Sequence, residues 1–523
     1  MREGSGRVGR APCRPRMTRA SPVTEQTIAS LDGRAARSPN ALVRRRRVPS
    51  HGTGPCPPFG RSSWRRYCRR SWIRRAASSS ADIPSSLHLA ADFYPVVTSG
   101  RSPPAVELVA RSRKPVPGLR RVAARASDAD IPSMPAHSSI FANHVASRLP
   151  TARASMGRNE PCWCLSGDKW KKCHMDREAM EPFSPFEVEA DWRRRGKRGY
   201  CSHSLDGTGC ADGISGSHTV QRRGGLAAIA EGKSLVLTVK PQSMRAMIDH
   251  DGRPPPVAIG TGKASVFPGF CGRHDGAVFK PIEGSDVALD ADDALLFGFR
   301  ATAYERFTKA VQVENTRLQR QMDRGQPLAV QERIQRHLHL TLAGARRSLA
   351  ETDAVMGEYR ARLASGDRVG LHHRAFRFDG LLPLVVAGGF MPELAIDGTR
   401  LQHLARGDAA FDQLTLTITS YAGRSVAVFA WIGSHDGASA AYVEAFDAVS
   451  DADKADAVVQ LAFEQLENIY LRPSWWNGLP MAQRDDLQRR VRAGAAMNPR
   501  TSGSYVPNRP PLATAAVVER TRG

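Results

Sequence analysis

The chain has 523 residues, of which 75 are Lys or Arg and 51 are Asp or Glu, so its formal net charge is +24. This length is enough for three or four domains. No run of about eighteen apolar residues and no secretory signal is present, so we expect neither a transmembrane helix nor export. The cysteines beyond Cys68 fall into two bunches, which is typical of metal sites in a reducing compartment, and we expect a cytoplasmic protein.

Most of the positive charge lies in residues 1–155. This segment holds 28 Lys and Arg against 8 Asp and Glu, whereas the rest of the chain holds 47 against 43. It is rich in Ser, Pro, Gly and Ala and has no sustained apolar period, so we expect it to be disordered. One interpretation is a basic arm for nucleic acid or an anionic membrane. The other is a stretch translated upstream of the true start, with Met156 as the initiator and residues 1–155 not native.

Four candidate metal ligands follow in the stretch GRNEPCWCLSGDKWKKCH, residues 157–174. They are Cys162, Cys164, Cys173 and His174, in the spacing C-x-C-x8-C-H. Zinc prefers four tetrahedral thiolate and imidazole ligands, and such a set closes a structural site. The Ser, Gly and Asp residues between the pairs suit a tight turn, and nearby lysines offset the negative charge of the thiolates. The stretch therefore predicts a zinc site.

This stretch resembles the SEC-C motif, the zinc-binding tail of the bacterial preprotein translocase ATPase SecA, which recurs in many other proteins. The matching positions are Gly157, Arg158, Asn159, Pro161, Cys162, Cys164, Ser166, Gly167, Lys169, Lys171, Lys172, Cys173 and His174. The departures from the usual residues are Glu160, Trp163, Leu165, Asp168 and Trp170. All four ligands are retained. The resemblance implies a zinc knuckle over residues 156–180 that docks to a protein partner.

A second set of cysteines and histidines lies in residues 195–288. Cys271 and His274 form a C-x2-H knuckle of the kind that zinc sites favour, and Cys201 and Cys210 are candidates for the other pair. The alternative is a group of buried thiols and packed imidazoles. We predict a second zinc-stabilised module, interrupted by an inserted strand in KSLVLTVKP. Three histidines compete for its ligand positions: His203, His218 and His274.

The second set also resembles, more distantly, an HNH-type ββα-metal nuclease. In that family, cysteines precede a strand that ends in a histidine, and a Cys-x2-His knuckle followed by Phe comes later. The resemblance implies that His218 is a general base, with His274 or Asp275 holding a divalent ion on the scissile phosphate. The chain departs from the pattern because eight residues separate Cys201 and Cys210 and the middle Asn of the family has no counterpart. The fold expectation is HNH-like or treble-clef-like, and catalysis stays open.

A helical hairpin is predicted over residues 290–366. Asp290 is a candidate N-cap for the first helix, and apolar residues then recur at spacings of three and four. Gly325 to Pro327 interrupts the pattern, which resumes with a seven-residue repeat. The repeat favours either a coiled-coil dimerisation arm or packing within the hairpin, of which we expect the second. Its members are Leu342, Leu349, Met356 and Leu363.

The C-terminal part is predicted to form an α+β domain over residues 370–485. Alternating β-branched and aromatic residues in QLTLTITSY and SVAVFAWIGS indicate strands, and an amphipathic helix with an apolar face from Val458 to Ile469 is expected to follow. No Ser/His/Asp set or phosphate-binding Gly loop is evident. Residues 486–523 are rich in Arg, Pro and Ala, and we expect a disordered tail.

The whole chain is thus predicted to be an α+β protein that binds zinc. The first functional hypothesis is a non-enzymatic adaptor that contacts a protein partner through the SEC-C-like knuckle, with nucleic acid as a further possible partner and no membrane contact. The second is a metal-dependent nuclease with His218 as its base. Net charge beyond residue 155 is only slightly positive, which favours the first, because phosphate contacts reward a strongly basic surface.

Overall fold

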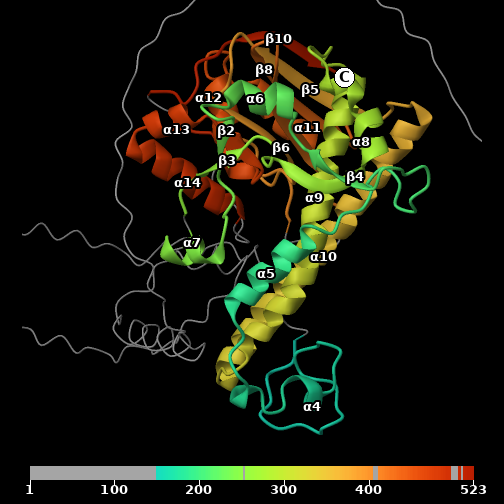
Figure 1. Ribbon diagram of the computed structural model, residues 1–523, viewed down its shortest axis with the longest axis vertical. Helices are drawn as coiled ribbons and strands as arrows, with labels where there is room; N and C mark the ends of the chain where they lie inside the picture. Colours follow the sequence, from blue (N-terminus) through green and yellow to red (C-terminus); the bar gives the residue numbers. More distant parts are fainter. Residues whose placement is uncertain (1–148, 251, 253, 405–409, 496–504, 508–509) are drawn as a thin grey trace, which may run out of the picture. The chain divides into compact units, whose positions relative to one another are not determined.

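The structure, a computed structural model, describes residues 149–523 except 251, 253, 405–409, 496–504 and 508–509 (Figure 1). The described residues belong to one compact unit, Asp82–Gly523. The expectation of disorder over residues 1–155 therefore lies outside the described residues, apart from 149–155. The elements in chain order are α4 (Trp170–Cys173), η2 (Arg177–Ala179), α5 (Pro185–Arg195), β1 (Ile214–His218), η3 (Arg222–Leu226), α6 (Ala227–Ile229), β2 (Leu235–Thr238), α7 (Met244–Asp249), β3 (Val257–Gly260), β4 (Val266–Cys271), α8 (Gly272–Val278), η4 (Lys280–Glu283), α9 (Ala291–Gln319), η5 (Arg320–Asp323), α10 (Leu328–Ser365), β5 (Leu371–Phe378), β6 (Leu384–Phe390), β7 (Leu414–Tyr421), β8 (Arg424–Ile432), α11 (Ala438–Asp447), α12 (Lys454–Gln465), β9 (Ile469–Leu471), α13 (Pro473–Gly478), α14 (Met481–Ala495) and β10 (Val517–Arg522).

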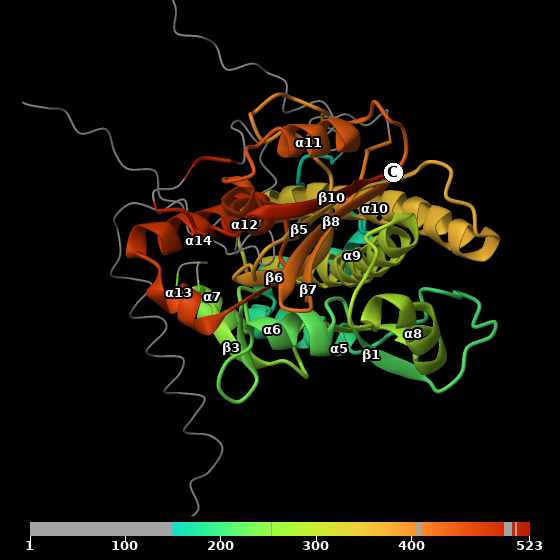
Figure 2. The same cartoon turned by 90° about the horizontal axis from the view of Figure 1, so that it is seen from above.

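An antiparallel sheet with the strand order β10-β5-β8-β7-β6-β9-β2-β3 forms the centre of the described part of the chain. Its inner strands are buried on both faces, with every residue of β7 buried. Two helical layers cover the sheet, as Figure 2 shows: α11 and α12 lie over one face, and α9 lies against the other. The α+β class predicted from the sequence is confirmed. The helix expected to reach Ile469 is shorter, because α12 ends at Gln465 and Ile469 begins β9, which pairs with β6 and β2.

The predicted helical hairpin is present as α9 and α10, which pack against each other. The Asp290 side chain accepts hydrogen bonds from the backbone N–H groups of Asp292 and Asp293, so it caps α9 as expected. Gly325, with φ of +70°, and Pro327 separate the two helices, and Gly366 ends α10 in the left-handed conformation.

The seven-residue repeat of α10 packs within the protein. Met356 is fully buried and lies in the core shared with α9 and the sheet, and Leu342 packs against Val313 of α9. This is the intramolecular packing that we expected. Nothing in the described residues shows a coiled-coil dimer.

The segment 195–288 is divided between two sheets. Strands β1 and β4 form a two-stranded antiparallel pair of their own, whereas β2 and β3 join the large sheet, where Leu237 pairs with Leu471. The inserted strand predicted in KSLVLTVKP is therefore present, and it links the second Cys/His segment to the C-terminal domain. Pairing between residues so distant in sequence cannot be read from local pattern.

The described part of the C-terminal tail differs from the expectation of disorder over 486–523, of which 496–504 and 508–509 lie outside the described residues. Helix α14 continues to Ala495, and β10 pairs with β5 at the edge of the large sheet. Leu512 is buried in the core, and Glu519 forms an ion pair with Arg377 at 2.6 Å. The open edge of β5 and this buried leucine give the tail partners that its composition does not reveal. Among the described residues, no helix has the length and apolar character to cross a membrane.

Candidate metal centres

The first predicted ligand set is brought together in the structure. The Sγ atoms of Cys162, Cys164 and Cys173 and a ring nitrogen of His174 lie within 4.8 Å of one another, and all four residues are buried. Zinc bonds to sulfur and nitrogen are about 2.3 and 2.0 Å long, so tetrahedral ligands of one ion lie roughly 3.5–3.8 Å apart. The arrangement fits a single zinc ion.

A tight turn positions the first two cysteines against the second pair. The Cys162 N–H donates a hydrogen bond to the carbonyl of Asp168 at 2.9 Å, which closes the loop between them. Leu165 and Gly167 have positive φ values of 55° and 89° within that loop. Helix α4 then places Cys173 on its inner side, beside the loop. The Ser/Gly/Asp composition of the loop predicted this turn.

The imidazole of His174 has a defined orientation. Its Nδ1 lies 3.2 Å from the Sγ atoms of both Cys162 and Cys173, whereas its Nε2 lies 2.8 Å from Oδ2 of Asp323. A carboxylate can only accept, so Nε2 carries the hydrogen and donates it to Asp323. Nδ1 is then the nitrogen that faces the thiols and is available to a metal ion. A carboxylate behind the outer nitrogen of a ligating histidine is a recurrent feature of zinc sites.

Asp323 is a site residue that the sequence analysis missed. It is fully buried and also accepts hydrogen bonds from Arg177 Nε and Gln335 Nε2, both at 2.7 Å. It lies in η5, 149 residues beyond His174, within the turn between α9 and α10. No local spacing connects the two residues, so only the folded chain reveals the contact.

The protonation of the first cluster reflects these contacts. Burial by itself lowers the pKa of His174, but the hydrogen bond to Asp323 and the neighbouring thiols raise it to about 10. Hydrogen bonds from Cys162 and Cys173 hold the pKa of the Cys164 thiol well below its usual range. A bound zinc ion would hold the three sulfurs as thiolates and would take the place of a proton on the Nδ1 of His174.

The knuckle is attached to the end of the helical hairpin. Arg177 donates to the Arg320 carbonyl at 2.9 Å and to Gln321 at 3.2 Å, and its own carbonyl accepts from the Gly325 N–H at 3.0 Å. Arg320 in turn donates to the carbonyl of Cys164. Figure 1 shows α4 beside the turn that joins α9 and α10. The hairpin therefore holds the knuckle through hydrogen bonds to its backbone and to its histidine ligand.

The second predicted ligand set is also brought together. Ligand atoms of Cys201, Cys210, Cys271 and His274 lie within 4.8 Å of one another, with Cys201 and Cys271 buried and the other two half-buried. The His274 Nδ1 lies 3.4, 3.7 and 3.3 Å from the Sγ atoms of these three cysteines. The same donor set, three thiols and one imidazole, is thus assembled twice in the chain.

The second cluster sits where β4 runs into α8. Cys271 is the last residue of β4, and its side chain accepts a hydrogen bond from the His274 N–H at 3.4 Å, so the sulfur also caps α8. His203 stacks on His274 with ring centroids 4.0 Å apart, but it is not part of the ligand group. Asp275 is also outside that group. Of the three competing histidines, His274 is the one placed among the cysteines.

His218 lies away from the second cluster. In the β1–β4 ladder His218 pairs with Val266, whereas Cys271 pairs with Ile214 at the opposite end. The His218 Nε2 lies 3.3 Å from the carbonyl of Thr261, to which it can only donate. The structure therefore does not join His218 and His274 in one site.

Comparison with known families bears on the first cluster. A family model described as SEC-C motif matches residues 158–176. Residues 158–176 are a SEC-C motif. The SEC-C motif contains all four residues of the first cluster and none of the second. No curated protein and no solved structure matches the chain.

Proposed function

We propose that this protein is a non-enzymatic zinc-binding adaptor, in which two structural zinc ions hold surfaces that contact a partner. The observation that carries the proposal is the donor set of the two clusters. Each offers three cysteine sulfurs and one histidine nitrogen, all from the protein. Four such ligands complete the tetrahedral shell of zinc and leave no position for water or substrate, which is the pattern of structural rather than catalytic zinc.

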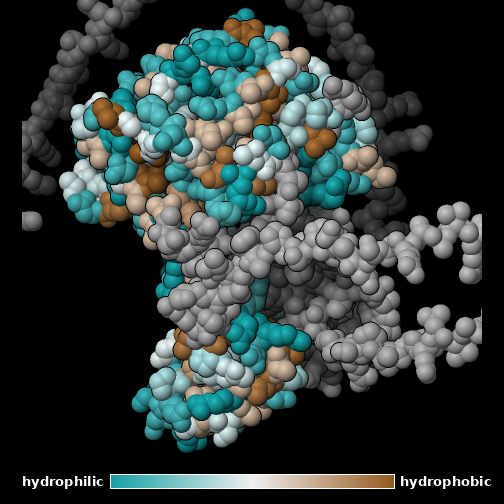
Figure 3. Space-filling view, turned by 180° about the vertical axis from the view of Figure 1, so that it is seen from behind, coloured by the Kyte–Doolittle hydropathy of each residue, from teal (hydrophilic) through white to brown (hydrophobic). Residues whose placement is uncertain are grey.

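The exposed face of the SEC-C motif supports a polar docking surface. Lys169, Lys171 and Lys172 are exposed, and Leu165 is 45% exposed beside them. These side chains would meet an acidic protein segment or the phosphates of a nucleic acid. On the side of the molecule that Figure 3 draws, brown, hydrophobic residues are scattered among teal ones over the coloured part. A charged partner surface is therefore a better fit than a large apolar one.

Zinc stoichiometry tests the adaptor proposal. We expect about two zinc ions per chain by elemental analysis of the purified full-length protein, and one after Cys162→Ser or Cys271→Ser. Ser285→Ala, at an exposed position outside both clusters, is the control and should retain both ions. A protein that carries no zinc, or that loses no zinc in either cysteine variant, would contradict the proposal.

A nuclease is the second candidate, favoured by the surroundings of His218. Burial lowers the pKa of His218, and the charges of Arg222 and Arg300 lower it further, against the opposing effects of Thr261 and Glu283. The imidazole is then neutral at physiological pH, with Nε2 turned to the Thr261 carbonyl and Nδ1 left to accept a proton. Arg222 is exposed and could contact a phosphodiester, whereas Arg300 is buried and forms an ion pair with Glu283 at 2.7 Å.

Cleavage assays distinguish the two candidates. A nuclease should cut single- or double-stranded DNA or RNA in the presence of Mg2+ or Mn2+ and lose activity in His218→Ala, while the exposed His250→Ala control keeps it. The adaptor proposal predicts no cleavage with either ion. Cleavage that persists in His218→Ala would point to a contaminant and would remove the support for the second candidate.

A further inference from the structure

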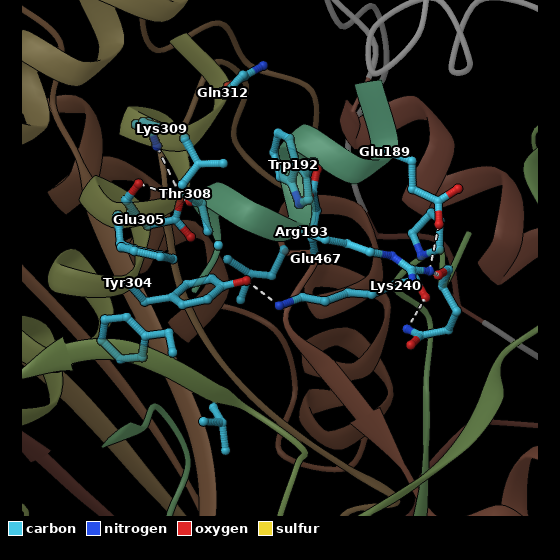
Figure 4. A pocket seen from close by; sticks show the side chains of 18 of the residues that line it. Glu189, Trp192, Arg193, Lys240, Tyr304, Glu305, Thr308, Lys309, Gln312 and Glu467 are labelled. Atoms are coloured by element: carbon cyan, nitrogen blue, oxygen red, sulfur yellow. Dashed lines mark hydrogen bonds and ion pairs between the residues drawn. The ribbon is translucent and has the colours of Figure 1, made fainter. Parts of the chain in front are cut away.

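A cavity of about 700 Å3 lies apart from both Cys/His clusters and from His218. Figure 4 shows it from close by. It is lined by α5, the segment after β2, the start of β4, the middle of α9 and the end of α12. Its volume falls in the range of small-molecule sites, and it is formed by segments far apart in sequence.

Four of the charged residues that line the cavity form two ion pairs with each other. Arg193 forms an ion pair with Glu189 at 2.6 Å, and Lys309 forms one with Glu305 at 3.1 Å. In each pair the two residues are one helical turn apart, the first pair on α5 and the second on α9. Neither pair leaves an unmatched charge for a ligand.

The third basic group of the lining is also engaged. The Lys240 Nζ donates hydrogen bonds to the hydroxyl of Tyr304 and to Oδ1 of Asn468, the second at 2.9 Å. In Figure 4 the Lys240 and Tyr304 side chains point toward each other. Two of the three ammonium hydrogens of Lys240 are thus already used within the protein.

Glu467 is different from the other charged residues of the lining. Its side chain is exposed, and it forms no hydrogen bond or ion pair with any residue that the structure describes. Although the residue reaches solvent, protein atoms crowd its carboxylate and partly desolvate it, which raises its pKa; the charge of Glu305 raises it further, while Lys240 and Lys309 oppose the shift. Its carboxylate is therefore the acidic group of the described lining that a ligand can contact without displacing a direct partner.

Aromatic rings supply the rest of the recognition surface. Trp192, Phe267, Tyr304 and Phe307 all line the cavity together with Glu467. Phe267 packs edge-on to Tyr304, with centroids 5.5 Å apart, so the two rings hold each other in place. Aromatic faces attract cations and also pack against aliphatic chains. A carboxylate among aromatic rings is suited to an organic cation.

We propose that this cavity binds an organic cation, an alkylammonium or guanidinium group, with Glu467 as its counter-ion and the aromatic residues around its carbon chain. Such a ligand pairs with the carboxylate that has no direct partner and leaves the hydrogen bonds of Lys240 and the ion pairs of Arg193 and Lys309 intact. An anion would face the carboxylates of Glu467 and Glu305, and two of the three ammonium hydrogens of Lys240 are already donated to Tyr304 and Asn468. The cation could be a free small molecule or the side chain of a lysine or arginine in a peptide.

Probes that share one carbon chain test the charge of the ligand. We titrate the full-length protein with 1-butylammonium, 1-butylguanidinium, 1-butanol and butyrate, and follow binding by ligand-observed NMR. We expect both cations to bind at least tenfold more tightly than butanol or butyrate. Glu467→Gln should reduce cation binding to the level of butanol. Glu444→Gln, the same change at an exposed position of α11, should leave binding unchanged.

A cavity-filling variant provides a second test of the site in case Glu467→Gln does not fold. Thr308→Trp, in the lining of α9, should also abolish cation binding, and an unchanged unfolding temperature shows that either variant is folded. An acetylated and amidated peptide with one arginine that binds more tightly than butylguanidinium supports the cation site and assigns its source to a peptide. A weaker-binding peptide supports it and assigns a free small molecule. Equal binding of butyrate, cation binding retained in folded Glu467→Gln, or no cation binding at about 10 mM would overturn the proposal.

Discussion

Asp323 is the residue on which the geometry of the first cluster depends. It accepts hydrogen bonds from His174, Arg177 and Gln335 while its side chain is fully buried. Through His174 it fixes the nitrogen that faces the thiols, and through Arg177 it holds the knuckle to the hairpin. One carboxylate thus serves the metal site and its attachment together.

We predict that Asp323→Asn weakens zinc binding at the SEC-C motif by about 10–100-fold, because the histidine loses the charged group that orients it. Competition with a chromogenic chelator measures the change, and the second cluster in the same chain is the internal control. Equal retention of both zinc ions by the variant and the wild type would show that Asp323 has no such role.

The titration of Lys240 should make the free energy of unfolding depend on pH in the alkaline range. Burial lowers its pKa from 10.5 to about 8 in the folded protein, against the opposing charges of Glu467 and Glu305. Between about pH 8 and 10.5 Lys240 is mostly protonated in the unfolded chain and mostly neutral in the folded protein. The free energy of unfolding therefore rises with pH over this range and levels off near pH 10.5. The full shift corresponds to about 3 kcal/mol at most.

Urea unfolding at pH 7.5 and at pH 10 measures this contribution. We expect the gain in unfolding free energy between the two pH values to be smaller in Lys240→Met than in the wild type, by up to about 3 kcal/mol. The difference between the proteins cancels the titration of other lysines and of tyrosines. Parallel pH dependence in the two proteins would contradict a depressed pKa at Lys240.

Local residue patterns predicted both ligand sets, whereas the contacts of Asp323 and Lys240 could not be predicted from the sequence. The spacing of Cys162 to His174 is local, and a turn of suitable composition was visible between them. Asp323 contacts His174, which is 149 residues away in the sequence. Lys240 contacts Tyr304, which is 64 residues away. Such contacts are set by tertiary packing.

The two clusters differ in the elements that they support. The SEC-C motif has a small core of its own, in which Trp163 and Trp170 pack with the cysteines. The second cluster instead shares the central core, where Cys201 and Cys271 pack with residues of β4, α9 and the sheet. Loss of metal should therefore have local effects in one case and global effects in the other.

We predict that Cys162→Ser exposes residues 149–180 to protease but shifts the main unfolding transition little, whereas Cys271→Ser lowers the unfolding temperature by several degrees. Limited proteolysis with mass spectrometry and differential scanning calorimetry measure the two effects. A large loss of global stability in Cys162→Ser, with little in Cys271→Ser, would reverse the assignment.

Elements were predicted where their signals are local. The hairpin of α9 and α10 has a capping aspartate, a periodic apolar face and a Gly/Pro break, and each could be read from the sequence. The placement of β2, β3 and β10 in the large sheet could not, because strand pairing joins residues such as Leu237 and Leu471 that share no local pattern.

At the scale of the whole molecule, the start of the folded region lies upstream of Met156. Leu149 is 3% exposed and belongs to the core of the SEC-C motif, and Arg153 forms an ion pair with Glu160 at 2.9 Å. The boundary expected from composition therefore divides a set of residues that pack together.

We predict that a chain beginning at Met156 binds zinc at the SEC-C motif less stably than one beginning at Leu149, by about 1.5–3 kcal/mol for the lost leucine burial. Leu149→Ala in the full-length chain should reproduce most of the loss. Zinc release rates in the presence of a chelator measure it. Identical rates for all these proteins would place the start of the stable unit at Met156.

The central claim is that both clusters are closed zinc sites with three sulfur ligands and one nitrogen ligand. X-ray absorption at the zinc edge, measured on the full-length protein, tests it most directly. The account predicts a mean shell of about three sulfur atoms near 2.3 Å and one nitrogen near 2.0 Å for each zinc ion. A shell with fewer sulfurs and additional light oxygen ligands would show an open site at one or both centres, and would contradict a purely structural role for the metal.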